Sequence, residues 1–315
     1  MTPPRVLLSV EAGEAAAWGA ALAQAAAQAG LQAAILDAGA AHDPQSIGYI
    51  AFTHAGPVRD FRPYGRLKAL LSLWAGVEKA LALPAPPGVP LCRMVEPGLR
   101  MGMTEYVVGH VMRYHLGLDA ALRGPGPVWG APVPPLARDR LVCVLGLGEL
   151  GGDAARMLAT LRFSVRGWSR TLKTIPGVAC HAGPAGLRAA LAGAQIVVAL
   201  LPATPETENL LDSAALALPA PGARLINAGR GQVIDDAALL AALDAGRIGH
   251  ATLDVFRAEP PPANHPFRRH PRVTVTPHVA AATRPETAAP EVIAQILRAE
   301  AGIALRHIVD RARGY

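Results

Sequence analysis

The sequence has little cysteine. Only three cysteines occur in 315 residues, Cys92, Cys143 and Cys180, and they lie far apart along the chain. Such a set is too small and too dispersed for a disulfide framework or a zinc site, so we expect no structural metal. The scarcity also favours a reducing compartment, with the cytoplasm as the default location.

Long apolar runs are missing as well. None approaches the ~18 residues that a membrane helix needs. The N-terminal segment has no basic start, and it reaches Glu11 and Glu14 before any long apolar core develops. We therefore expect neither a membrane span nor an export signal.

Clusters of positive charge are also absent, although the formal net charge is +6. The arginines are scattered singly, and no basic stripe with interleaved aromatic residues is found. A small anionic ligand accounts for the charge as well as a nucleic acid does, and we expect the small ligand and no nucleic acid. Nucleic-acid binding remains an alternative, and it would require an affinity that falls steeply with salt.

What is present is apolar material arranged as alternating strands and helices. Hydrophobic residues make up 51% of the chain and charged residues 17%, which indicates a globular protein, and 315 residues suit two domains. A helix is expected over Ala12–Ala29. The expected strands of the first part are Arg5–Val10, Gln32–Leu36, Gly48–His54, Leu67–Leu73 and Val89–Val95.

A long apolar helix, residues 101–122, and a Pro/Gly-rich break, residues 123–135, mark a boundary before a second alternating series. Its expected strands are Leu141–Gly148, Phe163–Trp168, Ala194–Leu201, Ala223–Gly229, His250–Phe256 and Arg272–His278. Six such strands match a doubly wound nucleotide-binding sheet. A last helix is expected over Pro285–Ala301.

The segment "VLGLGELGG" places Gly146, Gly148 and Gly151 between a strand and a helix. These glycines allow a tight turn, close approach of the backbone to a pyrophosphate, and close packing of helix on strand. A purely structural turn would look the same, but the strand–turn–helix setting favours a dinucleotide site.

A carboxylate is missing where an NAD site would place one, at the end of the second strand. No Asp or Glu occurs between Asp153 and Glu206, and the second strand is followed by Ser169, Arg170, Thr171 and Lys173. These hydroxyls and cations suit the 2′-phosphate of NADP, so we expect NADPH to be preferred over NADH. A solvated basic turn is the alternative.

Three polar residues follow successive strands: Arg230, Glu259 and His278. Ligands of doubly wound sheets bind at the carboxyl ends of the strands, so these residues are candidates for one site. Each also has a plain structural interpretation: an exposed arginine, a helix-start glutamate and a capping histidine. Because all three residues follow strands in the same way, we favour one shared site over three separate structural roles.

The motifs "GLGELGG", "WSRT", "LLPATPET", "INAGRG", "LDVFRAEP", "TPHVAAATRP" and "VDRARGY" resemble the D-isomer-specific 2-hydroxyacid dehydrogenases, densely from about Leu67 onward. The resemblance implies an α/β fold of two doubly wound parallel-sheet domains. A Rossmann dinucleotide-binding domain, residues 99–282, would be inserted into a flavodoxin-like substrate domain, residues 1–98 and 283–315. It also implies a homodimer, with the long helix packed across the dimer.

The same resemblance assigns roles to residues. Arg230 would bind the substrate carboxylate and carbonyl, His278 would be the general acid/base, and Glu259 would hydrogen-bond the histidine. Backbone N–H groups of Ala75, Gly76 and Val77 would hold the substrate, beside Trp74 where a small residue is usual. Further cofactor contacts would come from Glu149, Leu150, Leu201, Pro202, Thr207, Ala228, Gly229 and Asp254.

We therefore expect an NADPH-dependent reductase of a small 2-oxo acid such as glyoxylate or hydroxypyruvate. His278 would give a proton to the developing alkoxide, and Glu259 would stabilise the imidazolium. A nucleotide-sensing binding protein with the same fold and little turnover is the alternative. The presence of Arg230, Glu259 and His278 together argues against it, because a sensor needs no acid.

Overall fold

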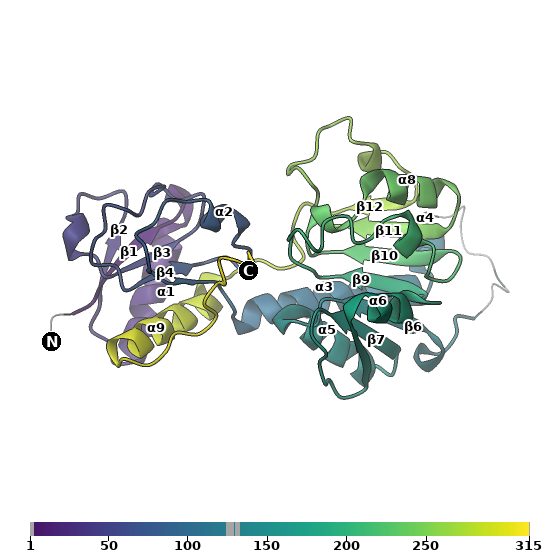
Figure 1. Cartoon of the computed structure of the whole chain (residues 1–315), viewed down its shortest axis with the longest axis horizontal. Helices are drawn as coiled ribbons and strands as arrows, with labels where there is room; N and C mark the ends of the chain where they lie inside the picture. Colours follow the sequence, from purple (N-terminus) through teal and green to yellow (C-terminus); the bar gives the residue numbers. More distant parts are fainter. Residues whose placement is uncertain (1–2, 124–128, 130–132, 315) are drawn as a thin grey trace. The chain divides into compact units, whose positions relative to one another are not determined.

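The computed structural model describes residues 3–123, 129 and 133–314, which divide into two compact units. One unit comprises Met1–Leu99 with Thr283–Tyr315, and the other comprises Arg100–Ala282. Most of the Pro/Gly-rich break expected between the two strand series lies outside the described residues. Each unit is built on its own parallel sheet (Figure 1).

The first unit has a five-stranded sheet in the order β2-β1-β3-β4-β5. This is the flavodoxin-like strand order. Its strands are β1 (Arg5–Ser9), β2 (Ala34–Asp37), β3 (Tyr49–Phe52), β4 (Ala69–Ser72) and β5 (Leu91–Cys92), and its helices are α1 (Ala12–Gln28), α2 (Glu78–Leu81) and α9 (Pro285–Glu300).

Helices α1 and α9 lie side by side against one face of this sheet (Figure 1). Trp18 and Leu22 of α1 share a buried cluster with Val292 and Ile296 of α9 and with alternate residues of the strands. The last helix, although more than 200 residues later in the chain, therefore completes the core of the first unit.

The second unit has a seven-stranded sheet in the order β12-β11-β10-β9-β6-β7-β8, with every strand parallel to its neighbours. This is the Rossmann order with one added strand. Its strands are β6 (Leu141–Leu145), β7 (Ser164–Ser169), β8 (Val178–Ala182), β9 (Ile196–Ala199), β10 (Ala223–Asn227), β11 (Ile248–Leu253) and β12 (Val273–Val275).

Side chains of β6 alternate between two cores. Val142 and Val144 face the cluster that contains α3 (Pro97–His115) and α5 (Glu149–Thr160), while Cys143 and Leu145 face the opposite cluster. The remaining helices of this unit are α4 (Leu118–Arg123), α6 (Gly183–Leu191), α7 (Ser213–Leu216) and α8 (Asp236–Asp244).

The predicted fold class is confirmed, and two details were wrong. The edge strand β8, with the weakly apolar sequence VACHA, was missed. The single helix expected over residues 101–122 is two helices, because Gly117 adopts a φ of 66° that ends the first of them.

Candidate active site

The glycine loop between β6 and α5 has the shape of a pyrophosphate cradle. Gly146 has a φ of 99°, and a Cβ there would lie 2.5 Å from the carbonyl oxygen of Leu200. A Cβ on Gly151 would overlap the carbonyl oxygen of Gly146. Gly148 is the N-cap of α5, and no side chain among the described residues caps that helix or lies within 4 Å of a Cβ at Gly148. The first-turn N–H groups are thus available to an anion.

The end of β7 forms an exposed, hydroxyl-rich and basic turn. Ser169 is buried, and its hydroxyl donates to the carbonyl of Thr171 at 2.8 Å. Arg170, Thr171 and Lys173 are exposed. Glu206, from the loop after β9, lies within electrostatic reach of Arg170. Hydrogen bonds from its own backbone and from Thr204, with the charge of Arg170, hold the pKa of Glu206 below its usual value.

Two further loops carry the other expected cofactor contacts. The Thr207 hydroxyl donates to the carbonyl of Pro202 at 2.7 Å and accepts from the Thr204 N–H at 2.9 Å, so it shapes its own turn. A Cβ on Gly229 would lie 2.7 Å from the backbone of Leu201, which shows that these loops are in close contact. Glu149 and Leu150 occupy the first turn of α5, and Ala228 is buried after β10.

Arg230 follows β10 in a turn that is fixed by a buried asparagine. Asn227 is 1% exposed, its Oδ1 accepts from the Gly229 N–H at 3.2 Å, and its Nδ2 donates to the carbonyl of Arg230 at 3.0 Å. The Arg230 guanidinium also donates to the carbonyl of Gly229 at 2.7 Å. Asn227 was not among the predicted site residues. The signal in the sequence is an asparagine that directly follows an apolar run, because such an amide needs hydrogen-bond partners once it is buried.

Glu259 and His278 form a hydrogen-bonded pair. Oε2 of Glu259 lies 2.7 Å from Nδ1 of His278, and Oε1 accepts from the N–H of Phe256 at 2.8 Å. One carboxylate oxygen is therefore held by the backbone and the other by the imidazole, which leaves Nε2 as the ring nitrogen not engaged by Glu259. The His278 side chain is 52% exposed.

A buried carboxylate holds the turn that carries His278, whose φ is 53°. Asp254 is 1% exposed. Its oxygens accept from the Thr276 hydroxyl at 2.5 Å and from the N–H groups of Val279 and Ala280, both at 2.9 Å, while its carbonyl accepts from the His278 N–H at 3.0 Å. We assigned Asp254 to the cofactor from the sequence. Its side-chain hydrogen bonds among the described residues are with this turn, and the cofactor contact stays a prediction.

The substrate loop expected at residues 74–77 lies in the other unit, after β4. The Ser72 hydroxyl donates to the carbonyl of Trp74 at 3.0 Å, and Trp74 packs edge-on against His54 with ring centroids 4.1 Å apart. Burial, followed by the nearby charges of Lys79 and Arg59, lowers the pKa of His54 to about 4, so the ring is neutral at pH 7. Val77 is buried as the N-cap residue of α2, and Ala75 and Gly76 are partly exposed.

Arg230, Glu259 and His278 thus follow β10, β11 and β12, which are adjacent and parallel in one sheet. Across the described residues, no three side chains of histidine, cysteine, aspartate or glutamate are grouped so that they could hold a metal ion. No helix in this part of the chain has the length and apolarity needed to cross a membrane.

Known proteins are similar to this chain over most of its length. Residues 129–280 match the family model described as D-isomer specific 2-hydroxyacid dehydrogenase, NAD binding domain. The glyoxylate/hydroxypyruvate reductase A of Serratia proteamaculans is 43% identical over 259 residues, covering 80% of this chain and 82% of that protein. The reductase of the same name from Yersinia enterocolitica is 42% identical, with 79% and 82% covered.

Solved structures agree with this result. A D-isomer specific 2-hydroxyacid dehydrogenase from Xanthobacter autotrophicus Py2, in complex with NADPH and MES, matches with a TM-score of 0.90 and 39% identity over 100% of both chains. An NADPH-dependent glyoxylate/hydroxypyruvate reductase from Sinorhizobium meliloti, in complex with NADP and sulfate, matches with a TM-score of 0.85 and 34% identity over 99% of this chain and 100% of its own. The resemblance predicted from the motifs is confirmed: the chain belongs to the D-isomer-specific 2-hydroxyacid dehydrogenase family and is an NAD(P)-dependent oxidoreductase.

Proposed function

We propose that this protein is an NADPH-dependent reductase that converts small 2-oxo acids, such as glyoxylate and hydroxypyruvate, to 2-hydroxy acids. The observation that carries the proposal is the 2.7 Å hydrogen bond between Glu259 and His278, in the same unit as a glycine loop shaped for a dinucleotide. Relatives at 42–43% identity named glyoxylate/hydroxypyruvate reductase A support the substrate class. In this proposal the Arg100–Ala282 unit binds the cofactor, and the other unit supplies the substrate loop.

The residues at the ends of β6 and β7 fit NADPH. The glycine loop and the first turn of α5 would hold the pyrophosphate, and Arg170 with Ser169, Thr171 and Lys173 would hold the 2′-phosphate. When bound, NADPH supplies the hydride to the carbonyl carbon of the substrate. The similar Xanthobacter and Sinorhizobium proteins were solved with NADPH and NADP, which supports the choice of cofactor.

Arg230 anchors the substrate in this proposal. Its forked guanidinium is suited to bind a carboxylate and to polarise the adjacent carbonyl, and Asn227 fixes the turn from which it extends. The N–H groups of Ala75, Gly76 and Val77 would bind substrate, as the resemblance implies. Trp74, which packs against the neutral ring of His54, would limit the size of the group attached to the oxo carbon.

His278 supplies the proton. As an imidazolium it donates from Nε2 to the developing alkoxide, while Glu259 accepts from Nδ1 and compensates the positive charge. Asp254 keeps the 276–280 turn in place during this transfer. In the reverse direction the neutral ring would accept the hydroxyl proton of the 2-hydroxy acid.

We also propose a cytoplasmic homodimer. Helix α3 leaves Met101 57% exposed, and an apolar side chain on a long helix suits a partner surface. Free cysteines, two of them buried, suit a reducing compartment. Light scattering of the purified protein would give twice the chain mass for the dimer, and the single chain mass would contradict it.

The test is turnover by the purified protein. NADPH oxidation is followed with glyoxylate, hydroxypyruvate and a panel of larger 2-oxo acids, and the 2-hydroxy acid product is identified. We expect turnover with the small substrates and a decline as the substrate grows. Tight NADPH binding with no oxidation on any 2-oxo acid would instead indicate a nucleotide-sensing protein.

A further inference from the structure

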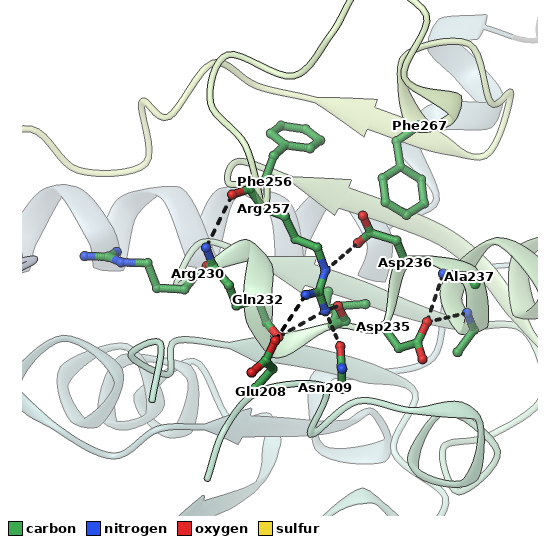
Figure 2. Close-up of polar contacts among 12 residues, drawn as sticks. Glu208, Asn209, Arg230, Gln232, Asp235, Asp236, Ala237, Phe256, Arg257 and Phe267 are labelled. Atoms are coloured by element: carbon green, nitrogen blue, oxygen red, sulfur yellow. Dashed lines mark hydrogen bonds and ion pairs between the residues drawn. The ribbon is translucent and has the colours of Figure 1, made fainter. Parts of the chain in front are cut away.

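Arg257 lies four residues after the end of β11, and its guanidinium contacts acceptors from residues 208–209, from residues 232–234 and from Asp236, the first residue of α8 (Figure 2). The side chain is 32% exposed. Nη2 donates to the carbonyl of Ile234 at 2.6 Å, to the carbonyl of Gln232 at 3.4 Å and to the side chain of Asn209. Ion pairs of 3.7 Å link the same guanidinium to Glu208 and to Asp236.

The backbone of Arg257 contacts the same turn. Gln232 Nε2 donates to the carbonyl of Arg257 at 3.4 Å. A Cβ on Gly231 would overlap the backbone of Phe256 and Arg257, so the two segments touch with no side chain between them. The side chain and the backbone of Arg257 therefore both contact residues 231–234.

The two segments in contact, residues 231–234 and the one that contains Phe256 and Arg257, lie next to the proposed catalytic groups. Arg230 immediately precedes Gly231 and is the N-cap of the 3-10 turn Gly231–Val233, and its side chain extends away from the Arg257 network (Figure 2). On the other segment, the N–H of Phe256 holds Glu259, which holds His278. Arg257 is thus placed where it can set the position of Arg230 relative to the Glu259–His278 pair.

We propose that Arg257 is a positioning residue for substrate binding, acting through the turn that carries Arg230. This inference rests on the proposed function. A guanidinium is suited to the task because it is planar, always charged, and donates to several acceptors at once, whereas a lysine ammonium is a point charge. Loss of the Arg257 hydrogen bonds would let the turn that carries Arg230 shift. A displacement of ~1 Å at a reacting group costs about a hundredfold in rate.

The experiment compares Arg257→Met with a matched control, Arg247→Met. Arg247 also donates to two backbone carbonyls in the same unit, those of Ala217 and Pro219, but it supports a loop without proposed site residues. We expect Arg257→Met to lower kcat/KM for glyoxylate roughly ten- to a hundredfold. The Kd for NADPH and the pH profile should stay as in the wild type, because neither the glycine loop nor the Glu259–His278 bond involves the guanidinium. Arg247→Met should change stability alone.

A double-mutant cycle tests whether Arg257 acts through Arg230. In an Arg230→Lys background, Arg257→Met should have little further effect, because the group it positions is already compromised. Equal losses in both backgrounds would overturn the proposal. Arg257→Lys, which keeps the charge and one donor direction, should recover part of the activity; identical behaviour of Arg257→Met and Arg247→Met would also overturn it.

A binding measurement separates this inference from the proposed activity. Calorimetry of oxalate binding to the NADPH complex requires no turnover. Arg257→Met should weaken oxalate binding about tenfold or more while the control variant does not. Unchanged oxalate affinity contradicts the role of Arg257, whereas oxalate binding by a wild type that reduces no 2-oxo acid contradicts only the proposed function.

Discussion

At the level of single residues, the proposed proton transfer depends on the hydrogen bonds of Glu259 and His278. Glu259 gives one oxygen to the backbone of Phe256 and the other to Nδ1 of His278. Because both oxygens are held, the carboxylate cannot rotate away from the ring. The imidazole therefore keeps a fixed orientation with Nε2 available for proton transfer.

We predict that His278→Ala abolishes reduction but leaves cofactor binding intact. Loss of a general acid costs about 10²- to 10⁴-fold in kcat. NADPH affinity, followed by fluorescence titration, should be nearly unchanged, because the glycine loop lies at the ends of other strands. A variant that keeps most of its kcat would show that His278 only shapes the turn.

Glu259→Gln should lower kcat/KM for glyoxylate. A neutral amide can still accept a hydrogen bond from Nδ1, but it does not compensate the positive charge of the imidazolium that donates the proton. The measurement is kcat/KM for glyoxylate, with Arg247→Met as the control. An unchanged kcat/KM would contradict the proposed pairing.

Some of these residues can be predicted from the sequence and others cannot. Arg230, Glu259 and His278 each follow an apolar run directly, so their place at strand ends can be read from the sequence. The role of Arg257 cannot be predicted in this way, because the groups it contacts are 21 to 49 residues away in the chain. The hydrogen bonds of Asp254 are hidden for the same reason, since they reach the turn 22 to 26 residues later.

At the scale of elements, strand order decides which loops meet. Parallel pairing of β10, β11 and β12 places their carboxyl ends at one edge of the sheet, and this could be expected from six alternating runs. The edge strand β8 could not, because its burial is incomplete and its apolar signal is weak. The break between α3 and α4 depends on the backbone of Gly117, one of 32 glycines in the chain.

The C-terminal end of α9 is anchored by one carboxylate. Oε1 of Glu300 accepts from the Tyr49 hydroxyl at 2.5 Å and from the Lys68 ammonium at 2.7 Å. Burial raises the pKa of Glu300, but the hydrogen bonds from Lys68 and Tyr49 outweigh it, so the pKa lies below its usual value. Helix α9 is thereby tied to β3 and to the residue before β4.

Glu300→Ala should destabilise the protein, because it leaves the buried Tyr49 hydroxyl without its acceptor. The expected cost is about 1–3 kcal/mol, measured by urea unfolding at pH 7. A glutamate with a lowered folded-state pKa stabilises the fold above its ordinary pKa and loses that contribution as the pH falls. The difference between wild type and variant should therefore shrink in acid.

Asp60→Ala is the control for this prediction, since it removes an ion pair with Arg62 that is exposed on both sides. It should cost much less than Glu300→Ala, because exposed ion pairs contribute little to stability. Equal destabilisation by the two variants would show that Glu300 has no special anchoring role. NADPH affinity should be unaffected in either case.

For the whole molecule, the proposed site residues are distributed over both parallel-sheet units. The seven-stranded unit has the glycine loop, the basic turn and the Arg230, Glu259 and His278 side chains, and the five-stranded unit has the Trp74 loop. Motif order along the chain was enough to predict the family. The preferred 2-oxo acid was not predictable, because in the proposed function it depends on the contacts of Trp74 and His54 rather than on a motif.

The proposed reduction of 2-oxo acids with NADPH is tested by comparing kcat/KM for the two nicotinamide cofactors at saturating glyoxylate. We predict that NADPH is preferred, because the end of β7 presents Arg170 and Lys173, and no Asp or Glu occurs in the sequence between Asp153 and Glu206. Arg170→Ala should weaken NADPH roughly ten- to a hundredfold, the equivalent of ~1.5–3 kcal/mol, and leave NADH nearly unchanged. Equal or better use of NADH by the wild type would contradict the account.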